Sequence, residues 1–339
     1  MKTLTIVVPC YNSADYLARC VDSLLQGDDD VEVLLVDDGS TDATSPMADD
    51  YAARFPGVVR AVHQPNGGHG AAINTGVREA TGQFVKIVDS DDWLDARAYR
   101  EVLHTLRQLA AVDVDAVVSN FVYEKVGKRH KTAVRYRTVL PADRPFTWDD
   151  VGQFGRKQYV LMHSLIYRTA LLRECGLRLP EHTFYVDNLY AYVPLAHVRR
   201  LYYLDVDLYR YHIGRPDQSV NEAVMLRRVD QYLRINKVMV THLGRAWADP
   251  QVPPALSRYL LHYAEIVCAA SSVLLTRAGT QAARRTKDLF WQDLNDENPW
   301  LYRRLRRGML GRLANLPGRP GRGISVLAYR AAKHVVGFS

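Results

Sequence analysis

Short apolar runs alternate with helix-like stretches through the first hundred residues, and this alternation limits the possible folds more than any other feature. Four runs rich in β-branched and aliphatic side chains are typical of buried strands, at residues 3–9, 31–36, 58–62 and 84–88. Residues 16–25 and 71–80 between them repeat apolar side chains at helical spacing. The alternation indicates an α/β fold, with a mostly parallel central sheet and helices on both faces.

Beyond residue 100 the strand pattern is less regular. It predicts a strand at 116–124, an exposed β-ribbon at 131–139, a buried strand at 159–167, a short helix at 188–197 and one or two strands at 201–211. From Asn221 the pattern is helical almost to the end. We therefore predict an α/β domain at residues 1–220 and a C-terminal, mainly helical region at residues 221–339.

Three carboxylates, Asp89, Asp91 and Asp92, follow the strand at 84–88 directly. Their mutual repulsion requires a compensating cation, and hard oxygen ligands favour Mg²⁺ or Mn²⁺, often shared with substrate phosphates. Asp92 or Asp95 could instead cap a helix that begins near Ala96, but a cap accounts for only one of the acids. The cluster therefore predicts a divalent metal site.

A second acidic pair, Asp37 and Asp38, follows the strand at 31–36. The carboxyl ends of parallel strands meet at one edge of a sheet, so both clusters are expected there. Carboxylates in this position can accept hydrogen bonds from a nucleobase or from ribose hydroxyls, although the same residues also suit an ordinary strand-to-helix turn. Pairing with the first cluster favours a binding site.

The loop Asn66-Gly67-Gly68-His69-Gly70 lies between the two clusters, and its glycines allow the backbone to approach a ligand closely. The sequence has neither the G-x-x-x-x-G-K-S/T motif of a P-loop nor a G-x-G-x-x-G motif after the first strand. These absences disfavour P-loop phosphotransferases and Rossmann dehydrogenases.

In their order and spacing, these motifs resemble family 2 glycosyltransferases with the GT-A fold, over roughly residues 3–215. The matching segments are Val7 to Asn12, Val36 to Asp42, Asn66 to Gly68 with Asn74 to Gly76, and Val88 to Asp92. The resemblance implies a nucleotide-diphosphate sugar as donor, commonly a UDP-sugar, and an inverting transfer. It also makes residues 1–220 the nucleotide-sugar-binding and catalytic domain.

The resemblance also implies roles for individual residues. Asp38, with Asp37, would contact the base and ribose, Asp89 would approach the ribose, and Asp91 would be the leading metal ligand, with Asp92 in support. Further donor contacts would come from Pro9, Tyr11, Asn66, Gly67 and Ser90. Trp93 and His163 would line the acceptor pocket or simply be packed in the core.

Two positions depart from the family pattern. Many members carry Ala-Arg-Asn where this chain has Ala72-Ile73-Asn74, so His69 either replaces part of the missing arginine or merely fills a turn. The catalytic base usually ends a Glu-Asp pair, but here Val186 stands in place of the Glu. Asp187 is therefore the candidate base, and a helix N-cap is its alternative role.

Residues 209–219 resemble the family segment that folds over the donor diphosphate. His212 and Arg215 in this segment suit phosphate, because both donate charge-assisted hydrogen bonds. A solvated loop beside an aromatic strand is the alternative.

Basic residues gather at the C-terminus. Residues 298–339 hold nine Lys and Arg and no acid, whereas residues 1–297 hold 35 bases and 37 acids, which disfavours a nucleic-acid partner. Leu301, Leu305, Met309 and Leu313 lie four apart among arginines, and Ile324, Leu327, Ala331 and Val335 repeat the spacing. This predicts either an interfacial helix on an anionic membrane or packing on the protein's own domain.

Two further observations bear on location. No apolar run of transmembrane length or signal peptide is evident, and the four cysteines form no C-x-x-C pair. We expect a cytoplasmic enzyme, peripheral to the inner face of the cell membrane. Its predicted acceptor is a hydroxyl of a cell-surface glycan, a teichoic acid or a lipid-linked sugar. The alternatives are a sugar-phosphate nucleotidyltransferase and a non-catalytic carbohydrate- or lipid-binding scaffold.

Overall fold

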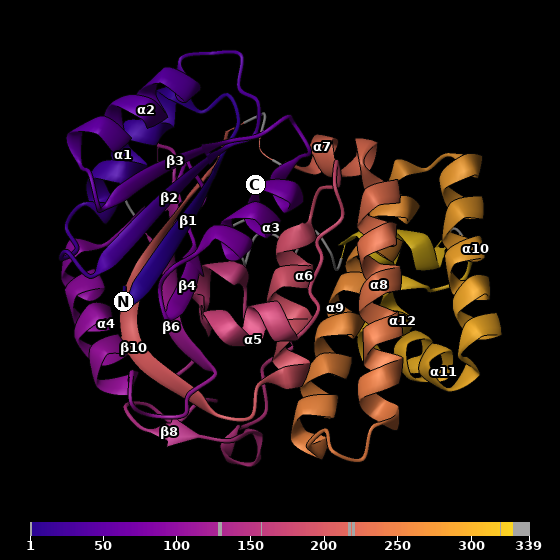
Figure 1. Cartoon of the computed structure of the whole chain (residues 1–339). Helices are drawn as coiled ribbons and strands as arrows, with labels where there is room; N and C mark the ends of the chain where they lie inside the picture. The colour runs from indigo at the N-terminus through magenta and orange to yellow at the C-terminus, as the bar shows by residue number, and fades with distance from the viewer. Residues whose placement is uncertain are drawn as a thin grey trace. The chain divides into compact units, whose positions relative to one another are not determined.

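The computed structural model describes residues 2–127, 131–156, 158–215, 218, 221–318 and 320–327. The chain divides into two compact units, coloured along the chain in Figure 1. Unit 1 comprises Met1–Gln153 and Val160–Ile213, and unit 2 comprises Phe154–Tyr159 and Gly214–Ser339. The helical unit thus begins at Gly214 and also takes in a short segment from the middle of the chain. The functional division at residue 220 stays a prediction.

Unit 1 is built on one mixed sheet. Its strands are β1 (Leu4–Cys10), β2 (Val31–Asp37), β3 (Val59–His63), β4 (Phe84–Ile87), β5 (Trp93–Leu94), β6 (Ala116–Lys125), β7 (Thr132–Val134), β8 (Pro145–Phe146), β9 (Leu165–Arg168) and β10 (Leu201–Ile213). They lie in the order β3-β2-β1-β4-β9-β6-β10-β5, with β7 paired to β6 and β8 to β10. Strands β1 to β4 run parallel, as do β6 and β10, whereas β9 is antiparallel to both neighbours.

Helices cover both faces of this sheet (Figure 1). They are α1 (Ala14–Leu24), α2 (Thr44–Arg54), α3 (His69–Glu79), α4 (Ala96–Leu109), α5 (Thr169–Glu174) and α6 (Val186–Tyr192). Every residue of β1 and β2 is buried, as expected for parallel strands between two helical layers. On one face α3 packs so closely that a Cβ on Gly76 would overlap the Val7 side chain of β1. The predicted α/β fold with helices on both faces is confirmed.

Three local predictions need correction. The exposed ribbon at 131–139 shrinks to β7, and Tyr136 behind it is fully buried. The strand predicted at 159–167 is only β9, preceded by a single 3₁₀ turn at Met162–Ser164. The helix predicted at 188–197 begins earlier, as α6, and then gives way to a 3₁₀ turn at Pro194–His197. Apolar runs of this length do not by themselves distinguish strand from turn.

Unit 2 is helical, as predicted for the C-terminal region. Its helices are α7 (Glu222–Arg227), α8 (Val229–Ala248), α9 (Pro254–Ala278), α10 (Gln281–Glu297), α11 (Pro299–Arg307) and α12 (Met309–Ala314). Helix α9 contacts all five of the others. Polar side chains within it are paired, because Asn236 Nδ2 donates to Ser271 Oγ at 2.8 Å and Trp291 Nε1 donates to Ser272 Oγ at 3.0 Å.

Helix α9 also corrects the prediction that no apolar run reaches transmembrane length. By length and composition alone it could cross a membrane, since its 18-residue window has a mean hydropathy of 1.4. However, 67% of that window is buried inside the protein, as in the core helix of a soluble domain. The helix therefore gives only weak support to membrane insertion.

The structure separates the two parts of the predicted lipid-facing stripe. Leu301 and Leu305 are 1% exposed and belong to the core of unit 2, which agrees with the alternative that they pack on the protein's own domain. Ile324 and Leu327 are 52% and 64% exposed. Ala331 and Val335 lie outside the described residues.

Candidate active site

The carboxylates of Asp89, Asp91 and Asp92, in the turn after β4, do not cap helix α4. The cap of α4 is Asp95, whose Oδ1 accepts hydrogen bonds from the amides of Arg97 and Ala98 at 3.2 and 3.1 Å. Asp89 and Asp91 are half-buried, and Asp92 is 1% exposed. Helix capping therefore does not explain why three acids stand together in this turn.

Asp92 fastens this turn to β10. Its Oδ2 accepts a hydrogen bond of 2.6 Å from the Tyr209 hydroxyl, and its Oδ1 accepts one of 2.7 Å from the His212 amide. Burial, together with the negative charges of Asp91 and Asp89, raises the pKa of Asp92 well above its usual range. A carboxylate in this environment becomes more stable when it takes up a proton or when a cation binds beside it.

Asp89 is paired with a histidine from the glycine-rich loop. His69 Nε2 lies 2.9 Å from Asp89 Oδ1, and the Asp89 amide donates to the Tyr209 hydroxyl at 3.1 Å. Burial disfavours the charged form of both groups, but the hydrogen bond and the electrostatic attraction between them outweigh the effect of burial. The pKa of Asp89 is therefore lowered and that of His69 is raised. His69 therefore pairs with the acidic turn and does not only fill a turn of the loop.

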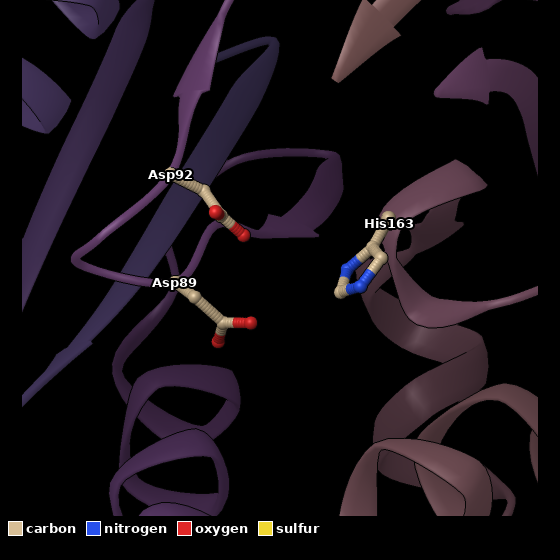
Figure 2. Close-up of side chains that lie close together, drawn as sticks. All are labelled: Asp89, Asp92 and His163. Atoms are coloured by element: carbon tan, nitrogen blue, oxygen red, sulfur yellow. The ribbon is translucent and has the colours of Figure 1, made fainter. Parts of the chain in front are cut away.

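His163 faces the same acids from the 3₁₀ turn before β9. Ligand atoms of Asp89, Asp92 and His163 lie within 4.8 Å of one another, and Figure 2 shows both carboxylates facing the imidazole. The ring stacks on Tyr209 with centroids 4.6 Å apart. Burial lowers the pKa of His163 to about 4, so the ring is neutral at pH 7. Among the described residues this is the grouping suited to a metal, and it does not include Asp91, the predicted leading ligand.

Lys86 lies within β4, buried beneath this group. Its ammonium donates to the His163 carbonyl at 2.8 Å, and burial lowers the pKa of Lys86 to about 7. The sequence analysis missed this residue. A lysine inside the apolar run Phe84 to Val88 was the available signal, because lysine is almost never fully buried without a partner.

Asp187 lies in the first turn of α6, and it does not cap the helix. The N-cap position is Tyr185, with a left-handed φ of 67°. Burial raises the pKa of Asp187 to about 6; the positive charge of His69 opposes this rise and the negative charge of Asp89 adds to it. A carboxylate with a pKa near 6 is well suited to accept a proton at neutral pH.

The segment that leads to Asp187 is attached to the glycine-rich loop. Asn74 exchanges two hydrogen bonds with the backbone of Leu179, at 2.9 and 3.0 Å, and the His182 amide donates to the Gly67 carbonyl at 2.7 Å. Gly68 has a φ of +85°, and a Cβ there would lie 3.0 Å from the His182 nitrogen. Sequence reasoning offered no signal for this contact, because about a hundred residues separate the two sides.

The acidic pair Asp37 and Asp38 lies at the carboxyl end of β2, on the side predicted to bind the nucleotide. Asp38 accepts hydrogen bonds from the amides of Gly67 and Gly68 at 2.9 and 2.7 Å and from Gln64 Nε2 at 2.7 Å. Asp37 accepts one from the Ser40 amide at 3.1 Å and pairs with His63. Both acids are buried and hold loops in place. Their direct contact with a base or ribose stays a prediction.

The remaining predicted residues differ in exposure. Pro9 is buried in β1, Tyr11 is 51% exposed, and Asn66 donates from its side chain to the Asp38 carbonyl. Ser90 Oγ lies 2.7 Å from Ser13 Oγ.

Residues predicted to contact the acceptor or diphosphate divide between the two units. The guanidinium of Arg19 lies 3.2 Å from the centre of the Trp93 ring, and the His212 ring lies 5.9 Å from the same indole. Arg215 belongs to unit 2, where its amide donates to Gln218 Oε1 at 3.2 Å. Its contact with a diphosphate stays a prediction.

Comparison with known proteins places these features in a family. Residues 5–169 match the model of glycosyl transferase family 2. The chain is 28% identical over 218 residues to EpsH of Bacillus subtilis, covering 62% of this chain and 60% of that protein. It is 28% identical over 228 residues to the poly(ribitol-phosphate) β-N-acetylglucosaminyltransferase TarS of Staphylococcus aureus, covering 66% of this chain and 38% of TarS.

Solved structures support the same fold. The structure of TarS 1–349 in complex with UDP-GlcNAc aligns with a TM-score of 0.54 at 20% identity, covering 88% of this chain and 92% of that one. A mannosyltransferase from Pyrobaculum calidifontis, in complex with GDP-Man and Mn²⁺, aligns with a TM-score of 0.52 at 20% identity, covering 98% and 86%.

The fold is of the GT-A type. Residues 5–169, just under half of the chain, carry a domain similar to glycosyl transferase family 2. The match favours a glycosyltransferase over the alternative of a sugar-phosphate nucleotidyltransferase. The chain spans about 60% of the length of EpsH and less of the length of TarS.

Proposed function

We propose that the protein is an inverting glycosyltransferase that moves a sugar from a nucleotide-diphosphate donor, a UDP-sugar, to an acceptor hydroxyl. The observation that carries the proposal is Asp187, a carboxylate with a pKa of about 6 that interacts electrostatically with His69 and Asp89 at the acidic turn. An inverting transfer needs a base of this kind to remove the acceptor proton as the hydroxyl attacks from the face opposite the leaving diphosphate.

Binding of the donor is assigned to the edge formed by the carboxyl ends of β1, β2 and β4. The side chains of Asp37 and Asp38 are oriented there by hydrogen bonds from the amides of Ser40, Gly67 and Gly68, and their oxygens keep further lone pairs for the donor. His212 is the proposed hydrogen-bond donor to the diphosphate, and Arg215, which belongs to unit 2, stays a candidate for the same role. The bound UDP-GlcNAc in TarS supports a UDP-sugar as the donor class.

The proposed cofactor is Mg²⁺ or Mn²⁺. The acids Asp89, Asp91 and Asp92 fit such an ion, since their charges repel one another and burial keeps the pKa of Asp92 high without a cation. A divalent ion supplies charge stabilisation to the leaving diphosphate. The mannosyltransferase complex with Mn²⁺ supports this choice.

The acceptor is proposed to be a hydroxyl of a cell-surface glycan, a teichoic acid or a lipid-linked sugar, consistent with the poly(ribitol-phosphate) acceptor in the name of TarS. We also propose a cytoplasmic location at the inner face of the membrane, where such an acceptor would be found. Two features support this location: the four cysteines are free, and Ile324 and Leu327 are exposed in the basic C-terminal region.

A panel of nucleotide sugars tests the proposal without knowledge of the acceptor. Purified protein is incubated with UDP-, GDP- and dTDP-sugars and a divalent metal, and release of the nucleoside diphosphate is measured. We expect slow hydrolysis of one or two UDP-sugars, abolished in Asp187→Asn. Binding of sugars without any hydrolysis or transfer would instead favour the non-catalytic scaffold, and once an acceptor is found, a retained anomeric configuration would contradict inversion.

A further inference from the structure

We propose that His163 is a nitrogen ligand of the divalent cation, so that Asp89, Asp92 and His163 together form a mixed nitrogen and oxygen site that selects Mn²⁺ over Mg²⁺. This inference rests on the proposed function only in assuming that the acidic turn holds a metal. It assigns His163 a role other than lining an acceptor pocket, and it differs from a site made of carboxylates alone.

The first support is a buried nitrogen without a partner. His163 is 4% exposed, and its Nδ1 has no hydrogen-bond partner among the described residues. A buried polar atom left without a hydrogen bond is costly, so its retention needs an explanation. The imidazole faces the carboxylates of Asp89 and Asp92, with ligand atoms within 4.8 Å of one another (Figure 2). Coordination of a cation placed between them would satisfy all three groups.

The second support is that the ring is held in place. Tyr209 stacks on it, the Tyr211 ring centre lies 4.2 Å away, and Phe121 meets it edge-on at 5.6 Å. Lys86 fixes the backbone of the same residue through its hydrogen bond to the His163 carbonyl. An imidazole held on several sides loses little further freedom on binding a metal, as in preorganised ligand sets.

The carboxylates are oriented in the same way and keep capacity for a metal. Each oxygen of Asp92 accepts one hydrogen bond, from Tyr209 or from the His212 amide, and Asp89 accepts one from His69. An ionised carboxylate offers about four lone-pair sites, so coordination remains open to both acids. Outer partners of this kind orient ligands and tune metal sites in proteins.

The ligand chemistry determines the selectivity. Mg²⁺ demands oxygen ligands and retains its waters, whereas imidazole suits transition metals. Carboxylates accept Mn²⁺ as readily as Mg²⁺, so one imidazole nitrogen is the group that separates the two ions. Removing it should reduce affinity for Mn²⁺ and leave affinity for Mg²⁺ unchanged.

The test uses metal binding alone, on the full chain without any nucleotide sugar. Calorimetric titration with Mn²⁺ and with Mg²⁺ compares the wild type with His163→Gln and His163→Asn, whose amide oxygens are hard ligands. We expect Mn²⁺ to bind the wild type more tightly than Mg²⁺ and to lose at least about tenfold in affinity in both variants, the lower limit seen when metal-site partners are removed. His104→Gln, at an exposed position of α4, is the matched control and should bind both ions as the wild type does.

Pulsed electron paramagnetic resonance of bound Mn²⁺ provides a second readout, which needs no variant. The wild type should show coupling to one imidazole ¹⁴N, and His163→Gln should lose it. Absence of this coupling in the wild type, or its loss in His69→Gln while His163→Gln retains it, would overturn the assignment. Neither result would affect the glycosyltransferase proposal, which the nucleotide-sugar panel tests separately.

Discussion

Replacement of Asp187 by Asn should lower turnover sharply and at the same time stabilise the protein. Asn keeps the size of the side chain and an oxygen that can accept the hydrogen bond that Asn188 Nδ2 donates to Asp187 Oδ1 at 3.3 Å. It cannot take up the acceptor proton at neutral pH. Loss of a positioned general base typically lowers a rate by about 10² to 10⁴, so turnover should fall at least roughly a hundredfold while donor affinity stays near the wild-type value.

The effect on stability follows from the raised pKa. The pKa of Asp187 rises from 3.8 to about 6 in the folded protein, so the folded state binds this proton more tightly than the unfolded chain. Charging the group above pH 6 therefore costs folding free energy, with about 3 kcal/mol as the upper limit for two pKa units. The side chain is only half-buried, so solvent screening reduces this to about 1–2 kcal/mol.

The sign of the pH dependence follows directly. Wild-type stability should fall as the pH rises from about 4 to about 6 and then stay level with respect to this group, while Asp187→Asn lacks this component. The gain in stability of the variant should therefore be absent near pH 4 and complete above pH 7. The acid limb of the wild-type rate profile should have its midpoint near pH 6.

Urea unfolding at several pH values and donor-binding and turnover assays on the same preparation check these expectations. Asp187→Glu is a useful control, because it keeps the base but displaces it. A variant Asp187→Asn that transfers sugar at nearly the normal rate would place the base elsewhere. Equal stability of variant and wild type at every pH would show that Asp187 carries no desolvation cost, and the assignment of its raised pKa to burial would then be wrong.

Three further outcomes are expected. Asp91→Asn should abolish metal-dependent binding of UDP, measured by calorimetry with Mn²⁺, whereas Mn²⁺ alone should still bind between Asp89, Asp92 and His163; unchanged affinity for UDP would remove Asp91 from the site. Ile324→Glu with Leu327→Glu should weaken co-sedimentation with anionic vesicles, because both side chains are exposed in a basic region. Gly76→Ala should lower the free energy of unfolding by about 1–3 kcal/mol, as expected for overpacking against Val7.

Each of these outcomes has a control. Asp91→Asn is compared by thermal unfolding with the wild type, so that loss of binding is not mistaken for loss of structure. The point variants in the tail replace truncation after Asn298, which would remove the buried Leu301 and Leu305 from the core of unit 2. Gly323→Ala has open space around its Cβ and should leave stability unchanged. An equal loss of stability in both glycine variants would show that overpacking against Val7 is not the cause.

Much of the first half of the fold could be predicted from the sequence because its signals are local. The runs that became β1, β2 and β4 are apolar enough to be buried on both faces, and helical spacing marks α1 and α3. The second half was less predictable, because an apolar run such as 159–167 is compatible with either a strand or a turn. Only packing against β4 and β6 limits β9 to four residues.

In the candidate site, too, local features were predictable and contacts between distant segments were not. The sequence by itself determined that acids follow β2 and β4 and that Asp187 opens a helix, since each of these positions depends on the chain immediately around it. It could not determine that Tyr209 and His212 bind Asp92, that His69 pairs with Asp89, or that His163 faces both acids. Those contacts join segments 20 to 120 residues apart, and the register between distant segments is set by the packing of the whole sheet, to which no local pattern responds.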